Sequence, residues 1–128
     1  MVNIEYKIGK IEINKENLNY PATHKFIVST NGDEVPGSVS LEIYVAACKN
    51  HPKLIEIFKL RRDKVKGGGS IYLQNGFLVF HGFSYEFGPI PKAVAEGFAK
   101  LVEEEFKKMG LKVTQFETDV SQKFFGSY

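Results

Sequence analysis

Residues 67–89 read GGGSIYLQNGFLVFHGFSYEFGP and contain the clearest structural signal in the chain. Two apolar segments, 70–74 and 77–83, flank the dipeptide Asn75-Gly76. This dipeptide is the strongest short-range signal for a β-hairpin, because both central residues of the favoured turn need a positive φ. The segment therefore predicts two antiparallel strands.

The same segment also has features of an anion site. Three consecutive glycines, residues 67–69, leave backbone that no Cβ shields, and the second strand ends in Gly-Phe-Ser before Gly88-Pro89. Such backbone exposes amides and a hydroxyl at the end of a strand, where anions bind. Taken alone, the glycines are also compatible with a flexible lead into the hairpin. The prediction of a phosphate site depends on their combination with residues 82–84 and 88–89.

The residues before this hairpin predict further strands. Ile4, Tyr6 and Ile8 alternate with polar residues, and the parity of the alternation changes at Gly9, which suits a bulge or a turn. One bent strand or a hairpin should therefore cover residues 4–13. Residues 25–30, KFIVST, form a compact segment before Asn-Gly-Asp, and we expect them to be a central strand.

Helices are expected on both sides of the hairpin. The apolar residues of segment 38–48 fit either period, and the length of the run favours a helix. Residues 52–60 predict a second helix, because Pro52 suits a first-turn position where its missing N–H costs nothing. Residues 90–109 place apolar side chains on one face before Gly110, which predicts a longer helix. A final strand should follow over 111–118.

These elements predict one α+β domain over residues 1–128, with a single mixed β-sheet and helices packed on it. The composition, 43% hydrophobic and 25% charged, is ordinary for a globular protein and argues against disorder. A chain of 128 residues can bury a core without disulfides or a structural metal.

Composition also bears on the compartment. Cys48 is the single cysteine, so it cannot form an internal disulfide, and its apolar neighbours predict a buried, inert thiol. The first residues lack the apolar core of a signal peptide, and no run of roughly eighteen apolar residues is present. We therefore expect a cytoplasmic protein with no membrane partner.

The order Gly-Gly-Gly-x-Ile at 67–71, a short hairpin, Gly-x-Ser at 82–84 and Gly-Pro at 88–89 resembles the pattern of the Janus/Ocnus family, the small phosphohistidine phosphatases. The likeness covers residues 67–89 well, with weaker agreement back to Lys25 and forward to the end of the chain. It implies a phosphohistidine-phosphatase-like domain that hydrolyses phosphohistidine or a related phosphoramidate without metal or cofactor. Its partner would be a phosphorylated protein or a small phosphoramidate.

The resemblance also implies the site residues. Phosphoramidates are already labile, so a phosphatase needs a base or nucleophile and groups that hold the phosphoryl oxygens. The family has a histidine at a helix start, a lysine in an early strand and a Gly-Tyr-Ser cradle. These roles fall on His51, on Lys25, and on Ser84 with the amides of Tyr85 and Glu86. Glu86 departs from the family, because a carboxylate beside phosphate is repulsive unless it turns outward.

The position of the catalytic histidine leaves two alternatives open. Counting back from Gly67 without gaps places the family's histidine at Val45, which would make the chain a non-catalytic module that binds phosphate or a phosphorylated ligand. A short deletion before the glycines brings His51 to that position, and we favour this alignment because the chemistry suits it. His81 is expected to be structural or exposed, and His24, adjacent to Lys25, should face away from it.

The sequence also bears on nucleic-acid binding and on metal binding. Five basic residues lie just before the glycines, and the chain is rich in Phe and Tyr, a combination compatible with nucleic-acid binding. The aromatic residues are more simply explained as core. The basic residues are Lys59, Arg61, Arg62, Lys64 and Lys66. Metal binding has little support, because three scattered histidines and one cysteine give no recognised ligand spacing.

Overall fold

The computed structural model describes residues 3–18, 24–30, 37–74, 77–81, 90–111, 113 and 115–119. They form six strands, two α-helices and two short 3-10 helices. The strands are β1 (Asn3–Ile11), β2 (His24–Thr30), β3 (Ser38–Ala47), β4 (Val65–Gln74), β5 (Phe77–His81) and β6 (Gln115–Asp119). The helices are α1 (His51–Phe58), α2 (Lys92–Lys108), η1 (Lys15–Asn17) and η2 (Arg62–Lys64).

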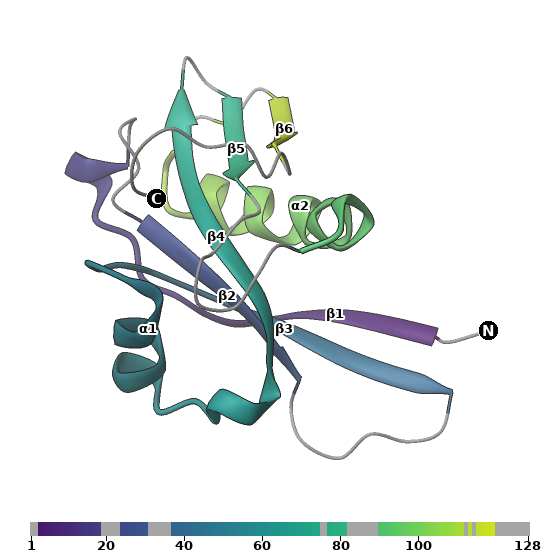
Figure 1. Ribbon diagram of the computed structural model, residues 1–128. Helices are drawn as coiled ribbons and strands as arrows, with labels where there is room; N and C mark the ends of the chain where they lie inside the picture. The colour runs from purple at the N-terminus through teal and green to yellow at the C-terminus, as the bar shows by residue number, and fades with distance from the viewer. Residues whose placement is uncertain are drawn as a thin grey trace.

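All six strands belong to one mixed sheet with the order β1-β3-β2-β4-β5-β6. β1 is parallel to β3 and β5 is parallel to β6, whereas β2 is antiparallel to both β3 and β4, and β4 to β5. The strand direction rotates strongly from β1 to β6, as expected for a twisted sheet (Figure 1). The predicted α+β class with one mixed sheet is confirmed.

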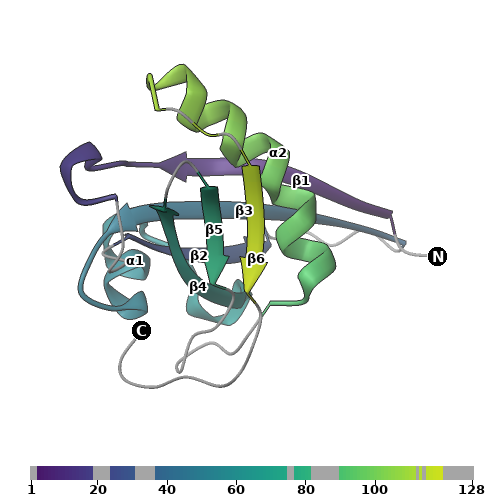
Figure 2. The ribbon, with the colours of Figure 1, turned by 90° about the horizontal axis from the view of Figure 1, so that it is seen from above.

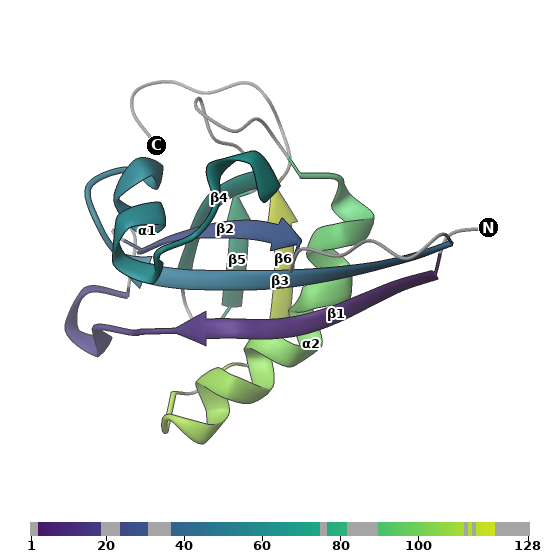
Figure 3. The ribbon, with the colours of Figure 1, turned by 90° about the horizontal axis from the view of Figure 1, so that it is seen from below.

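β2 is the central strand that the sequence predicted, since it pairs with β3 on one side and β4 on the other. The predicted hairpin is also present as β4 and β5, which pair from Gln74 and Phe77 outward. β1 is one bent strand rather than a hairpin, because its pairing with β3 shifts between Ile8 and Lys10. Figure 3 shows β1, β3 and β2 side by side.

The predicted helix over 38–48 is wrong, because residues Ser38–Ala47 form β3. Leu41, Ile43 and Val45 are buried in one cluster, and Ala46 belongs to another on the opposite face. Both faces are therefore covered near the end of this strand, where residues 43–47 form a continuous apolar run that imitates a helix. Pairing with β1 and β2 on its two edges decides the outcome.

Each face of the sheet carries one helix, as Figures 1 and 2 show. On one face, Phe98, Val102 and Phe106 of α2 pack in a large cluster with Phe26 and Val28 of β2. On the other face, Leu54 of α1 packs with Ile27 and Ala46 in a smaller cluster. Because side chains alternate along a strand, the residues of β2 divide cleanly between an α2 face and an α1 face.

α1 and α2 match their predicted positions closely. α1 begins at His51, one residue before the predicted Pro52, and the Asn50 side chain caps it by accepting a hydrogen bond of 3.1 Å from the backbone N–H of Lys53. α2 ends at Lys108 before Gly110, whose φ of 83° is readily adopted only by glycine. In the described part of the chain, no helix is both long and apolar enough to span a membrane.

Candidate functional site

His51 lies at the start of α1 with its imidazole against the sheet. The residue is 4% exposed, and its Nε2 lies 2.8 Å from the carbonyl oxygen of Gly69 in β4. A carbonyl can only accept, so Nε2 carries the proton and donates it to this bond. In the neutral ring the basic lone pair is then on Nδ1. The sheet thus fixes both the tautomer and the orientation of the ring.

The three glycines make this close approach feasible. They lie within β4 and pair with Phe26, Ile27 and Val28 of β2, so the alternative of a flexible lead into the hairpin is wrong. A Cβ at Gly68 would lie 3.0 Å from Cδ2 of His51 and 2.7 Å from the carbonyl oxygen of Phe26. Residue 68 must lack a side chain because the His51 ring occupies that space.

Lys25 lies on the same face of the sheet as His51. It is two residues before Ile27, which packs against α1, and it is 5% exposed. Burial lowers the pKa of Lys25 from its ordinary value, with an opposing contribution from Cys48. A buried ammonium of this kind is stabilised when an anion binds beside it.

Burial is the main reason that the pKa of His51 falls from 6.5 to about 4. The positive charge of Lys25 lowers this pKa further, and the hydrogen bond to the Gly69 carbonyl partly opposes the shift. The imidazole is therefore neutral at pH 7, as a general base or nucleophile must be. The His51 ring packs on Gly68, which pairs with Ile27 two residues after Lys25, so His51 and Lys25 share one face of the sheet.

Cys48 is half-buried near this pair. Its thiol donates to the backbone carbonyl of Asn50 at 3.4 Å. Burial raises the pKa of Cys48, and the charge of Lys25 opposes that rise. The thiol is therefore protonated at neutral pH, in agreement with the inert role expected, although it is less buried than predicted.

The remaining predicted residues divide between the two faces and the undescribed part of the chain. Val45, the alternative position for the family's histidine, is fully buried in the cluster under α2, on the face opposite Lys25. His24 also faces away from Lys25, as predicted, and its Nε2 accepts a hydrogen bond of 2.9 Å from the Asn14 N–H. The three proposed cradle residues, Ser84, Tyr85 and Glu86, lie outside the described residues.

Two residues on the Lys25 face were not recognised from the sequence. Lys25 pairs directly with Ser70 of β4, and Ser70 pairs with His81 of β5. Ser70 is 1% exposed and His81 is 4% exposed, so His81 is a buried residue rather than a surface one. The Asn75-Gly76 turn contained the signal for the second pair, because a two-residue loop sets Gln74 opposite Phe77 and hence Ser70 opposite His81.

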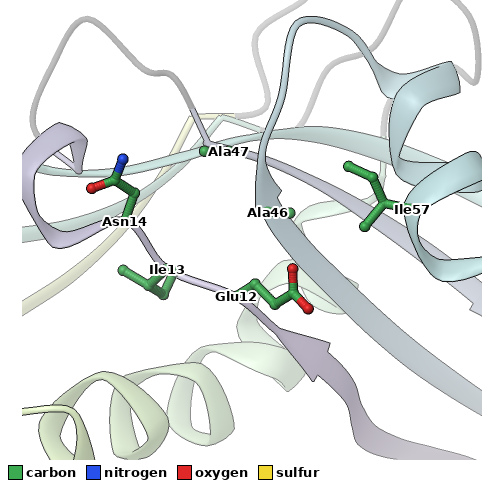
Figure 4. A pocket seen from close by; sticks show the side chains of 6 residues that line it. All are labelled: Glu12, Ile13, Asn14, Ala46, Ala47 and Ile57. Atoms are coloured by element: carbon green, nitrogen blue, oxygen red, sulfur yellow. The ribbon is translucent and has the colours of Figure 1, made fainter.

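A surface depression of about 240 Å³ lies near the ends of β1 and β3 (Figure 4). Its lining residues are Glu12, Ile13, Asn14, Ala46, Ala47 and Ile57. They include one carboxylate and no cation, so this depression does not suit a phosphate.

The charge of the basic segment 59–66 is partly neutralised. Arg61 forms two hydrogen bonds with the carboxylate of Asp63, at 2.8 and 3.2 Å, and both residues are exposed. Among the described residues, no three His, Cys, Asp or Glu side chains are grouped so that they could hold a metal ion.

No protein-family model matches this chain, and no curated protein sequence matches it either.

Proposed function

We propose that this protein is a metal-independent phosphatase that hydrolyses phosphohistidine or a related phosphoramidate. The observation that carries the proposal is the buried, oriented imidazole of His51 on the same face of the sheet as the buried Lys25 side chain. A general base or nucleophile next to a cation is the minimum that transfer of a phosphoryl group to water requires.

His51 has two chemically balanced routes. As a base, Nδ1 takes a proton from water while the water oxygen bonds to phosphorus and the P–N bond breaks, with the electron pair leaving on the substrate nitrogen. As a nucleophile, Nδ1 itself bonds to phosphorus as the P–N bond breaks, and water then hydrolyses the new P–N bond. In the base route the His51 imidazolium passes its proton to the leaving nitrogen, and in the nucleophile route that nitrogen takes a proton from water. In both routes Lys25 offsets the charge on the phosphoryl oxygens.

The resemblance supplies the rest of the proposed site. Ser84 and the amides of Tyr85 and Glu86 would hold the remaining phosphoryl oxygens, in the manner of oriented N–H groups that bind anions. This cradle is carried over from the Gly-x-Ser and Gly-Pro pattern of the sequence.

The direct test is hydrolysis of phosphoramidate and of a phosphohistidine peptide by the purified chain in excess chelator, measured as released inorganic phosphate. We expect turnover that chelator does not reduce. Phosphate binding without turnover would instead identify a non-catalytic phosphate-binding module. If neither occurs, and the chain binds single-stranded nucleic acid with an affinity that falls steeply with salt, the nucleic-acid alternative is correct.

Lys25 provides a second test of the same site. Lys25→Met keeps a long apolar stem and removes the charge, so the dissociation constant for inorganic phosphate should rise about tenfold, as for loss of one charge-assisted hydrogen bond. Stability should not fall, because the variant no longer buries an ammonium. Phosphate titration by NMR and urea unfolding measure the two quantities.

Lys7→Met is the matched control, since Lys7 is a β1 lysine whose side chain is 47% exposed. This variant should leave phosphate affinity unchanged. An unchanged affinity in Lys25→Met, together with a large loss of stability, would show that Lys25 is structural.

A further inference from the structure

A row of three buried polar residues crosses the sheet beside His51. Lys25, Ser70 and His81 are direct cross-strand partners on β2, β4 and β5. Directly opposed residues in an antiparallel pair point to the same face, with their Cβ atoms about 5 Å apart. All three therefore lie on the face that carries His51, because Gly68, two residues before Ser70, faces the His51 ring.

Ser70 is the residue of this row that carries a hydroxyl group. Its hydroxyl oxygen is buried and has no hydrogen-bond partner among the residues that the structure describes. A buried hydroxyl without a partner destabilises a folded protein, so such a group needs an explanation. Alanine would fill the same place in the strand without that cost. The hydroxyl is explained if a ligand completes its hydrogen bonding.

The neighbours of Ser70 indicate which ligand fits. On one side is the Lys25 ammonium, and the residue before Ser70 supplies the carbonyl that binds the His51 ring. A cation next to a hydroxyl donor favours an anion with several oxygens. The two strands lie about 4.8 Å apart. A hydroxyl on one and an ammonium on the other can therefore each place a hydrogen bond of about 3 Å on the same oxyanion.

We propose that the Ser70 hydroxyl is a further binding group for the phosphoryl oxygens, acting together with Lys25 on the α1 face of the sheet. This inference rests on the proposed function and extends the site from β2 to β4. The phosphoryl group then lies above the Lys25–Ser70 pair with phosphorus within reach of His51, and His81 continues the row beyond Ser70. Ser70 binds the substrate and takes no part in proton transfer.

The test compares Ser70→Ala with Ser70→Thr in the full chain, using inorganic phosphate for binding and phosphoramidate for turnover. Ser70→Ala should raise the dissociation constant for phosphate and the KM for phosphoramidate about tenfold, as for loss of a hydrogen bond to a charged group. Its stability should be equal to or greater than that of the wild type. Ser70→Thr keeps the hydroxyl and should restore most of the affinity.

Thr30→Val is the matched control. Thr30 also has a buried hydroxyl without a hydrogen-bond partner among the described residues, and it lies on β2 on the α2 face. Removing it should leave phosphate affinity and KM unchanged.

The failures of the two proposals can be told apart. If Ser70→Ala binds phosphate as well as the wild type while turnover still requires His51, the role of Ser70 is refuted and the phosphatase stands. If the wild type has no turnover but binds phosphate through Ser70, the phosphatase is refuted and the anion site stands.

Discussion

Replacing His51 should lower kcat for phosphoramidate about 100- to 10,000-fold, the range that a positioned general base contributes. His51→Gln is the sharper variant, because its side-chain amide N–H can still donate to the Gly69 carbonyl while the basic nitrogen is lost. His51→Ala should lose as much activity. Phosphate binding should change little in His51→Gln, since Lys25 and the hydroxyl donors remain. Steady-state kinetics with a parallel phosphate titration separates these effects.

His24→Gln is the control for this prediction. His24 is as buried as His51 and forms a hydrogen bond through Nε2, but it lies on the opposite face of the sheet. Glutamine can accept the same hydrogen bond from Asn14, so turnover should be retained. Activity that survives in both His51 variants would mean that another group performs the chemistry, even if the protein is a phosphatase.

The parts of the fold that the sequence predicted are those set by local signals. Asn75-Gly76 predicted the hairpin, and the apolar stripe ending before Gly110 predicted α2. The predicted helix over 38–48 is wrong because the decisive interactions are not local. β3 pairs with residues of β1 more than thirty positions earlier, such as Asn3 with Ser38. Near its end, where both faces are covered, β3 has a continuous apolar run without the alternation that distinguishes a strand from a helix.

In the candidate site, too, the sequence predicted some residues and gave no signal for others. The chemistry of the side chains and the resemblance point to His51 and Lys25, and the two residues lie on one face of the sheet. The structural role of the glycines was missed, because nothing local shows that the His51 ring will pack on Gly68. The pairing of Lys25 with Ser70 depends on how the hairpin docks against β2, and the sequence contains no signal for that register.

Acid should destabilise this protein through His51. The pKa of His51 is about 4 in the folded chain and 6.5 as its ordinary value, so between these two pH values the unfolded chain binds more protons. The contribution of His51 to the free energy of unfolding is therefore fully present above pH 6.5 and is lost as the pH falls through about 4. At 1.36 kcal/mol per pH unit, the loss from this residue is about 3 kcal/mol.

Urea unfolding of the wild type and of His51→Gln at pH 7 and at pH 4 isolates this contribution. Glutamine does not titrate, so the free energy of unfolding of the variant should fall by about 3 kcal/mol less than that of the wild type. The subtraction removes the carboxylates, which titrate alike in both proteins. Equal pH dependence in the two proteins would show that His51 keeps an ordinary pKa. The imidazole would then not be desolvated and held neutral as the proposed mechanism requires.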